Sequence, residues 1–206
     1  ISKSRLALLR TKARDEDIIR SALRYSSILS RSQQWNIPES VYKKWVTKYD
    51  LTMEGFASPF NSQIIKFGDY KFGSLFKDTD EVFGSVGNIF RQDLVGKVST
   101  LNPPFVLDIM NEAVTKAITT IKEAKEKNIK TTIYMVVPNW EDAEYYKILI
   151  KEKGIKQIKL EKYKHYFENS NEDDKKVVST FNSSIFILQY PDPRDNEYND
   201  IIEAFE

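Results

Sequence analysis

The chain has 206 residues, of which 41% are apolar and 30% charged, a balance typical of one globular domain with a sizeable core. It has no cysteine and a single histidine, which excludes disulfides and a cysteine nucleophile and argues against a multi-histidine metal centre. No apolar run approaches the length of a membrane span, and no secretion leader is recognisable. We therefore expect an intracellular protein, nuclear or cytoplasmic, with no membrane partner.

The net charge of +1 conceals an uneven distribution of charged residues. Residues 1–48 contain eleven Lys or Arg against four acids, whereas the tail is acidic. A basic segment on a nearly neutral protein favours a polyanionic partner such as nucleic acid. A solvated helix face would explain the same residues equally well.

The first elements predicted along the chain are helices. Apolar residues at helical spacing predict a helix over 4–29, and a shorter helix follows Pro38. A buried strand at 51–53 comes next. Six of the seven glycines then fall between residues 55 and 96, which indicates turns and close backbone approaches of the kind that a cofactor pocket needs.

After the glycines, predicted strands alternate with predicted helices. We expect strands at 97–101, 131–137, 155–160 and 184–190, and helices over 106–121 and 141–153. This order predicts an α/β fold, a Rossmann-like domain with a mostly parallel sheet behind a short helical N-terminal preface. We divide the chain into a basic preface (1–48) that could bind RNA, a Rossmann-like domain (49–192) and an acidic tail (193–206).

The sharpest motif is Asn-Pro-Pro-Phe at residues 102–105, between a predicted strand and a predicted helix. An exocyclic amine of a base is a poor nucleophile, because its lone pair is delocalised into the ring, and acceptors placed against its N–H bonds would help it react. The Asn102 oxygen and the Pro103 carbonyl suit that role, in a turn fixed by two prolines, without any metal. Phe105 could stack on the base. The same residues also suit a helix-starting turn with Asn as its cap.

Other candidate residues carry weaker signals. An acid followed by small residues at 54–61 suits a cofactor that approaches the backbone closely. Asp78 and Asp80 could bind charged or hydroxylated parts of that cofactor, although a solvated acidic turn explains them equally well. Trp140 could wall a base pocket or simply pack. His165 could touch the substrate, but a structural role is the better interpretation.

Taken together, these motifs resemble the phosphorylated-CTD-interacting-factor family, the cap-specific adenosine N6-methyltransferases. The likeness rests on the segments 54–61, 76–87 and 102–105, and on Gln33-Gln34-Trp35, Pro138-Asn139-Trp140 and His165 in the same order. It implies a Rossmann-type methyltransferase that uses S-adenosylmethionine as cofactor. The implied substrate is N6 of the 2′-O-methyladenosine beside the cap of messenger RNA.

The resemblance also implies roles for individual residues. The catalytic motif would be Asn102, Pro103, Pro104 and Phe105. The cofactor-binding residues would be Glu54, Phe56, Ala57, Ser58, Pro59, Asn61, Asp78, Asp80, Phe83 and Gly84. The substrate-binding residues would be Gln34, Trp35, Trp140 and His165.

Two alternatives to this function stay open. Asn-Pro-Pro-Phe alone is shared with DNA adenine methyltransferases, so the substrate could be DNA adenine. The chain could also be a non-catalytic RNA-binding subunit of a methyltransferase complex. Animal members of the family carry a WW domain and a larger helical domain that helps to read the cap, and this sequence shows neither pattern. If a capped messenger RNA is the partner, we expect a partner subunit or a further domain to help recognise it.

Overall fold

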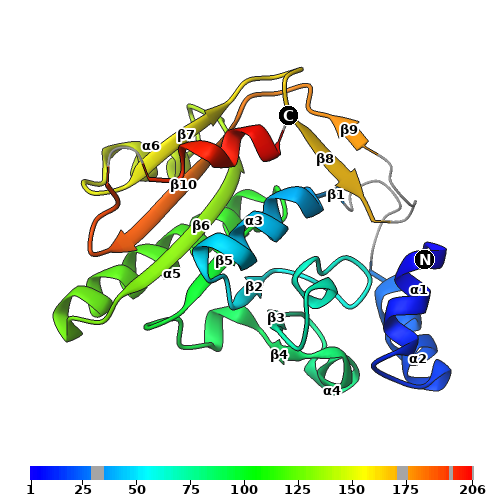
Figure 1. Cartoon of the computed structure of the whole chain (residues 1–206). Coiled ribbons are helices and arrows are strands. Elements are labelled where there is room, and N and C mark those ends of the chain that lie inside the picture. Colours follow the sequence, from blue (N-terminus) through cyan, green and yellow to red (C-terminus); the bar gives the residue numbers. More distant parts are fainter. Residues whose placement is uncertain (29–34, 171–175, 195–196, 206) are drawn as a thin grey trace.

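A seven-stranded sheet runs through the molecule in this computed structural model, which describes residues 1–28, 35–170, 176–194 and 197–205 (Figure 1). In spatial order its strands are β4 (Ser85–Gly87), β3 (Lys71–Gly73), β2 (Met53–Gly55), β5 (Val98–Leu101), β6 (Thr131–Pro138), β10 (Ser183–Tyr190) and β7 (Lys156–Leu160). The strands from β4 to β6 run parallel, and β10 is antiparallel to both of its neighbours. The sheet confirms the predicted α/β class and is compatible with a Rossmann-like fold.

Helices cover both faces of this sheet. On one face lie α5 (Leu107–Lys127) and α6 (Glu144–Lys151), and on the other lie α3 (Glu39–Tyr49) and the 3-10 segment η4 (Asn199–Ala204) (Figure 1). Alternate residues of β6 divide between the two sides: Met135 packs toward α5 and α6, whereas Tyr134 stacks on Trp45 of α3 with ring centroids 4.9 Å apart. Because both faces are covered, β6 is buried along its whole length, as expected for a central strand.

The N-terminal segment forms two helices where one helical span was predicted. They are α1 (Lys3–Arg10) and α2 (Asp15–Ser26), and the chain between them is extended at Arg14. Three acids occupy the first turn of α2, where carboxylates are favoured by the helix dipole, so they mark its start. Both helices pack into the core through Leu9, Ile18 and Tyr25.

The predicted boundaries at residues 48 and 192 do not separate independent cores. Ile201 and Phe205 of the tail belong to the same buried cluster as Leu9 and Trp45 of the preface. The Asp200 carboxylate accepts hydrogen bonds from Lys48 Nζ at 2.7 Å and from the Tyr49 hydroxyl, both on α3. Preface, central segment and tail are therefore packed together.

A second, smaller sheet was not predicted from the sequence. It is antiparallel and consists of β1 (Trp35–Asn36), β8 (Tyr166–Asn169) and β9 (Lys176–Val178) (Figure 1). The glycine-rich segment holds further short elements, η1 (Ile64–Lys66), α4 (Lys77–Asp80), η2 (Glu81–Phe83) and η3 (Ile89–Arg91). None of the helices in the described ranges combines the length and apolar character that a membrane span requires.

Candidate functional site

A large cavity opens where the order of the strands reverses. β2 and β5 are neighbours in the sheet, and the chain continues from β2 to β3 on one side and from β5 to β6 on the other. Ligands of open parallel sheets bind beyond the carboxyl ends of the strands at such a point. The cavity there has a volume of about 510 Å³, within the range of small-molecule sites. Its wall brings together both strand-end segments singled out from the sequence, through Glu54–Ser58 and Asn102–Phe105.

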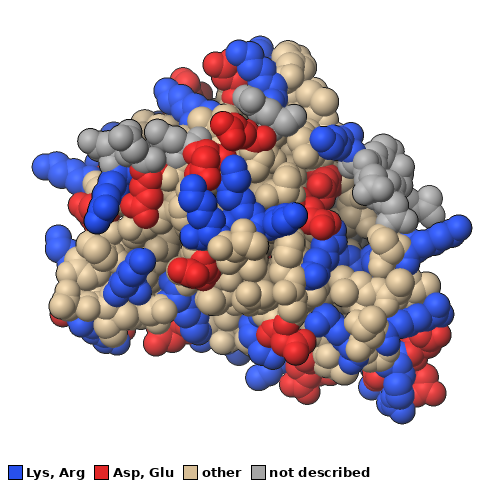
Figure 2. All heavy atoms as spheres, viewed as in Figure 1, with Lys and Arg blue, Asp and Glu red and all other residues tan. Residues whose placement is uncertain are grey.

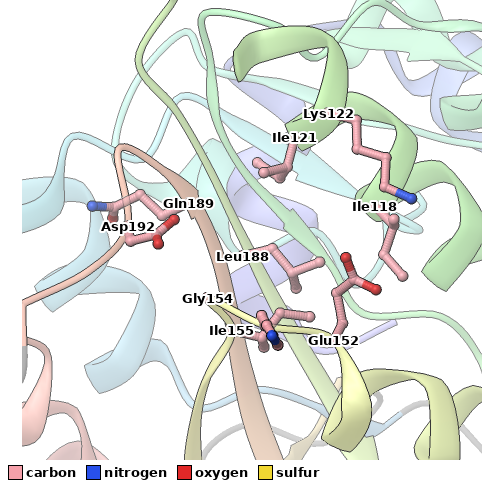
Figure 3. Close-up of a pocket in the computed structure, with 10 residues that line it drawn as sticks. Ile118, Ile121, Lys122, Glu152, Gly154, Ile155, Leu188, Gln189 and Asp192 are labelled. Atoms are coloured by element: carbon pink, nitrogen blue, oxygen red, sulfur yellow. The ribbon is translucent and has the colours of Figure 1, made fainter. Parts of the chain in front are cut away.

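A second hollow lies between α5 and β10 and is far smaller. Figure 3 shows Ile118 and Ile121 of α5 facing Leu188 of β10, with Gly154 and Asp192 nearby. Its volume is about 50 Å³, enough for a water molecule or two and too little for a nucleotide or cofactor. Of these two cavities, the larger one can hold a cofactor or a nucleotide.

The Asn102–Phe105 segment presents unused acceptors to the larger cavity. Asn102 is half-buried, and within the described ranges neither its amide nor the Pro103 carbonyl has a hydrogen-bond partner. The cap position of α5 is Val106, which makes no side-chain cap bond, so Asn102 does not cap that helix. Instead, the Val106 amide donates to the Pro104 carbonyl at 2.7 Å and fixes the turn. Within the described ranges, the Asn102 side-chain oxygen and the Pro103 carbonyl are therefore both available to a ligand.

Aromatic rings surround Phe105 at the cavity. The Phe181 ring lies 5.7 Å from it at 83°, and the Trp140 ring lies 6.3 Å from it at 70°. Trp35, which is 36% exposed, lines the cavity and stacks on both Phe167 and Phe181. The structure thus places Trp140 against Phe105, although Trp140 does not itself line the cavity, and it joins Trp35 to Phe105 through Phe181. Phe167 and Phe181 are cavity rings that the sequence had not indicated.

Glu54 lies at the floor of the cavity, at the carboxyl end of β2. Its Oε2 accepts hydrogen bonds from the Ser62 hydroxyl at 2.7 Å and from the Ile64 amide at 3.0 Å. Burial raises the pKa of this carboxyl, and the two hydrogen bonds oppose that shift. The neighbouring Gly55 is needed for close packing, since a Cβ there would lie 2.6 Å from the Thr100 carbonyl oxygen of β5.

The turn that follows β2 is closed by its own side chains. Phe56 lines the cavity with a backbone φ of +61°, a conformation that bulky residues adopt at the expense of strain. The Asn61 oxygen accepts hydrogen bonds from the Ser58 amide at 2.6 Å and from the Ser58 hydroxyl at 3.0 Å. Ala57, Ser58 and Asn61 line the cavity, whereas Pro59 is buried away from it.

The residues predicted at 78–84 do not line the cavity. Asp80 is fully buried and accepts hydrogen bonds from the hydroxyls of Ser21 and Tyr25, each at 2.7 Å, both on α2. Asp78 forms an ion pair at 2.8 Å with an arginine of the same helix. Phe83 is buried in the core, and Gly84 ends η2 with a φ of +107°. This segment holds α2 in place, and it bears on the cavity through Tyr25, which lines it.

Of the remaining predicted substrate contacts, His165 is buried and stands apart from the cavity wall. Its Nδ1 lies 2.7 Å from the Glu161 carbonyl oxygen and its Nε2 lies 3.2 Å from the Ser183 hydroxyl. Burial lowers the pKa of this histidine. These contacts tie the loop between β7 and β8 to the start of β10. Gln34 lies outside the residues that the structure describes.

About half of the basic residues of the preface are paired with acids, several of them from other parts of the chain. Figure 2 shows Lys and Arg interspersed with Asp and Glu over α1, α2 and α3. Six of the eleven take part in ion pairs within the described ranges: Arg10, Lys12, Arg14, Arg24, Lys44 and Lys48. The sequence alone therefore overstated the free positive charge of this segment.

No group of three His, Cys, Asp or Glu residues within the described ranges is placed to hold a metal ion.

Comparison with known proteins gives one family. No curated protein matches the chain. A family model described as "Phosphorylated CTD interacting factor 1 WW domain" matches residues 11–170, a stretch that contains the parallel strands of the sheet and most of the cavity wall. The chain belongs to this phosphorylated-CTD-interacting-factor family.

Proposed function

We propose that this chain is an S-adenosylmethionine-dependent methyltransferase that acts on N6 of adenosine in RNA. The observation that carries the proposal is a pair of acceptors, the Asn102 amide oxygen and the Pro103 carbonyl, that have no partner among the described residues. They lie beside the Phe105 ring in a cavity of about 510 Å³. The family match supports the same reading. Within the proposal, the natural substrate is the adenosine next to the messenger RNA cap, as the resemblance implies.

The residues of the cavity fit the proposed cofactor. Its volume lies within the range of small-ligand sites, and Glu54 at its floor offers a carboxylate that can accept from an ammonium or a ribose hydroxyl. Phe56, Ile89 and Phe90 supply apolar wall on the same side. We assign cofactor binding to these residues together with Ala57. Bound S-adenosylmethionine would supply a methyl group on a sulfonium, which is already a good leaving group.

The chain's own contribution to the reaction is preorganisation. The Asn102 oxygen and the Pro103 carbonyl each accept one N–H of the exocyclic amine, so its lone pair turns away from the ring and toward the methyl donor. The same two oxygens stabilise the positive charge that develops on nitrogen, and one N6 proton then leaves to solvent to give the neutral methylated amine. Phe105 holds the base in plane by stacking. The turn is rigid, so these groups need little reorganisation when the substrate arrives.

A single-stranded substrate suits this site. The target base must leave its stack to reach the cavity, which is least costly at an unpaired end.

Two other functions use the same residues. DNA adenine N6-methylation requires the same acceptors, because they contact the base and not the sugar. A non-catalytic RNA-binding subunit would keep the fold and the aromatic wall but transfer no methyl group.

The test is methyl transfer from labelled S-adenosylmethionine to matched oligonucleotides. The substrates are adenosine-initiated RNA with a cap, the same RNA without a cap, and DNA of the same sequence. We expect N6-methyladenosine in RNA, with the capped form preferred. Preference for DNA would favour the first alternative. Cofactor binding by calorimetry without transfer to any substrate would contradict the proposal and favour the binding subunit.

A further inference from the structure

Two loops place aromatic rings against Phe105 from different parts of the chain. Phe181 belongs to the loop at 179–182 between β9 and β10, and Trp140 follows the end of β6. Both rings stand at steep angles to Phe105, 83° and 70°. Pairs of this geometry, with centroids 4.5–7 Å apart, are attractive because the edge of one ring meets the face of the other.

The structure fixes Phe181 more firmly than its place in a loop suggests. Its ring stacks on Trp35 and Phe167, with centroids 6.3 Å away in both cases. Its carbonyl accepts a hydrogen bond from the Ser179 hydroxyl at 2.8 Å. The backbone carbonyl of the next residue, Asn182, accepts a hydrogen bond from the backbone N–H of Asn139 at 2.9 Å. The loop that carries Phe181 and the loop that carries Trp140 are therefore bonded to each other.

We propose that Phe181 is a positioning residue that sets the angle of the Phe105 ring for the target base, an inference that rests on the proposed function. The ring torsion of a phenylalanine is broad on its own, so a neighbouring ring is needed to define it. Phe181 is half-buried in the cavity wall, close enough to define that torsion. The small β1–β8–β9 sheet thereby acts on the site through Phe181.

The first test measures the ring itself and needs no activity. Phe105 is replaced by 3-fluorophenylalanine, whose fluorine moves when the ring turns, and its resonance is recorded in the folded protein. Phe181→Leu should shift and broaden the resonance, and Phe181→Tyr should restore it. Phe90→Leu, in the same cavity but in ring contact with Phe56, should leave it unchanged. An unchanged spectrum in Phe181→Leu would overturn the inference. If that variant fails to fold, Phe181→Met takes its place.

The second test asks whether Phe181 acts through Phe105. Phe181→Leu should lower kcat about 2- to 12-fold, the worth of one such ring pair, with the affinity for S-adenosylmethionine unchanged. In a Phe105→Leu background the same change should have no further effect. Additive losses would overturn the inference. If the unaltered chain transfers no methyl group while the fluorine signal still depends on Phe181, the proposed function fails and the link between the two rings stands.

Discussion

Replacing Asn102 with alanine separates catalysis from folding. The Asn102 amide makes no hydrogen bond within the described residues, so its removal leaves no protein group unpaired. The free energy of unfolding should change by less than about 0.5 kcal/mol. The proposed reaction would lose one of two acceptors at the amine. Loss of one such preorganised group lowers kcat about 100- to 1,000-fold, or about 2.7 to 4 kcal/mol.

The chain offers a matched control in Asn61, an asparagine of the same cavity whose oxygen accepts two hydrogen bonds from Ser58. Asn61→Ala should destabilise the fold by about 1 to 3 kcal/mol, since each lost hydrogen bond contributes about 0.5 to 1.5 kcal/mol. Thermal unfolding, cofactor calorimetry and methyl-transfer kinetics would be measured on both variants. Asn102→Ala with full activity, or with a melting temperature as low as that of Asn61→Ala, would refute the reasoning.

Four further outcomes follow from buried groups. Gly55→Ala should destabilise the fold by about 1 to 3 kcal/mol, because the new Cβ meets a backbone oxygen at 2.6 Å; wild-type stability in denaturant titration would contradict this. Asp80→Ala should cost about 1 to 3 kcal/mol for each buried hydroxyl left unpaired and should weaken cofactor binding through Tyr25; unchanged calorimetry would count against that link. For His165→Gln, the quantity to follow is the free energy of unfolding of the wild type minus that of the variant. This difference should rise with pH up to about the unfolded pKa of 6.5, because burial in the folded state disfavours protonation of His165; a difference that does not change with pH would contradict this effect. The corresponding difference for Glu54→Gln should fall as pH rises above 4.5, because burial favours the protonated carboxyl; a rise would refute the assigned burial effect.

The parts of the fold that local pattern determines could be predicted. The strands at 98–101, 131–138, 156–160 and 183–190 and the helix α5 follow from apolar periodicity, and all lie close to the expected ranges. The segments at 54–61 and 102–105 each followed a predicted strand, and most of the first and all of the second line the cavity. Their meeting agrees with the rule that open parallel sheets bind ligands beyond the carboxyl ends of their strands.

What could not be predicted depends on contacts between distant residues. Strands β3 and β4 have three residues each and lie among glycines, too short for a periodic signal. β1 exists because Trp35 pairs with Asn169 far along the chain. That pairing gathers Phe167 and Phe181 at the cavity. The burial of Asp80 likewise depends on hydroxyls of α2, so its sequence neighbourhood resembles an exposed acidic turn.

The most direct measurement is a structure of the chain with S-adenosylhomocysteine and a short adenosine-initiated RNA. We predict that N6 of the adenine lies about 2.7 to 3.2 Å from both the Asn102 side-chain oxygen and the Pro103 carbonyl, with the Phe105 ring flat against the base. A base bound outside this cavity, or an Asn102 amide turned toward a protein partner when the base is present, would contradict the account.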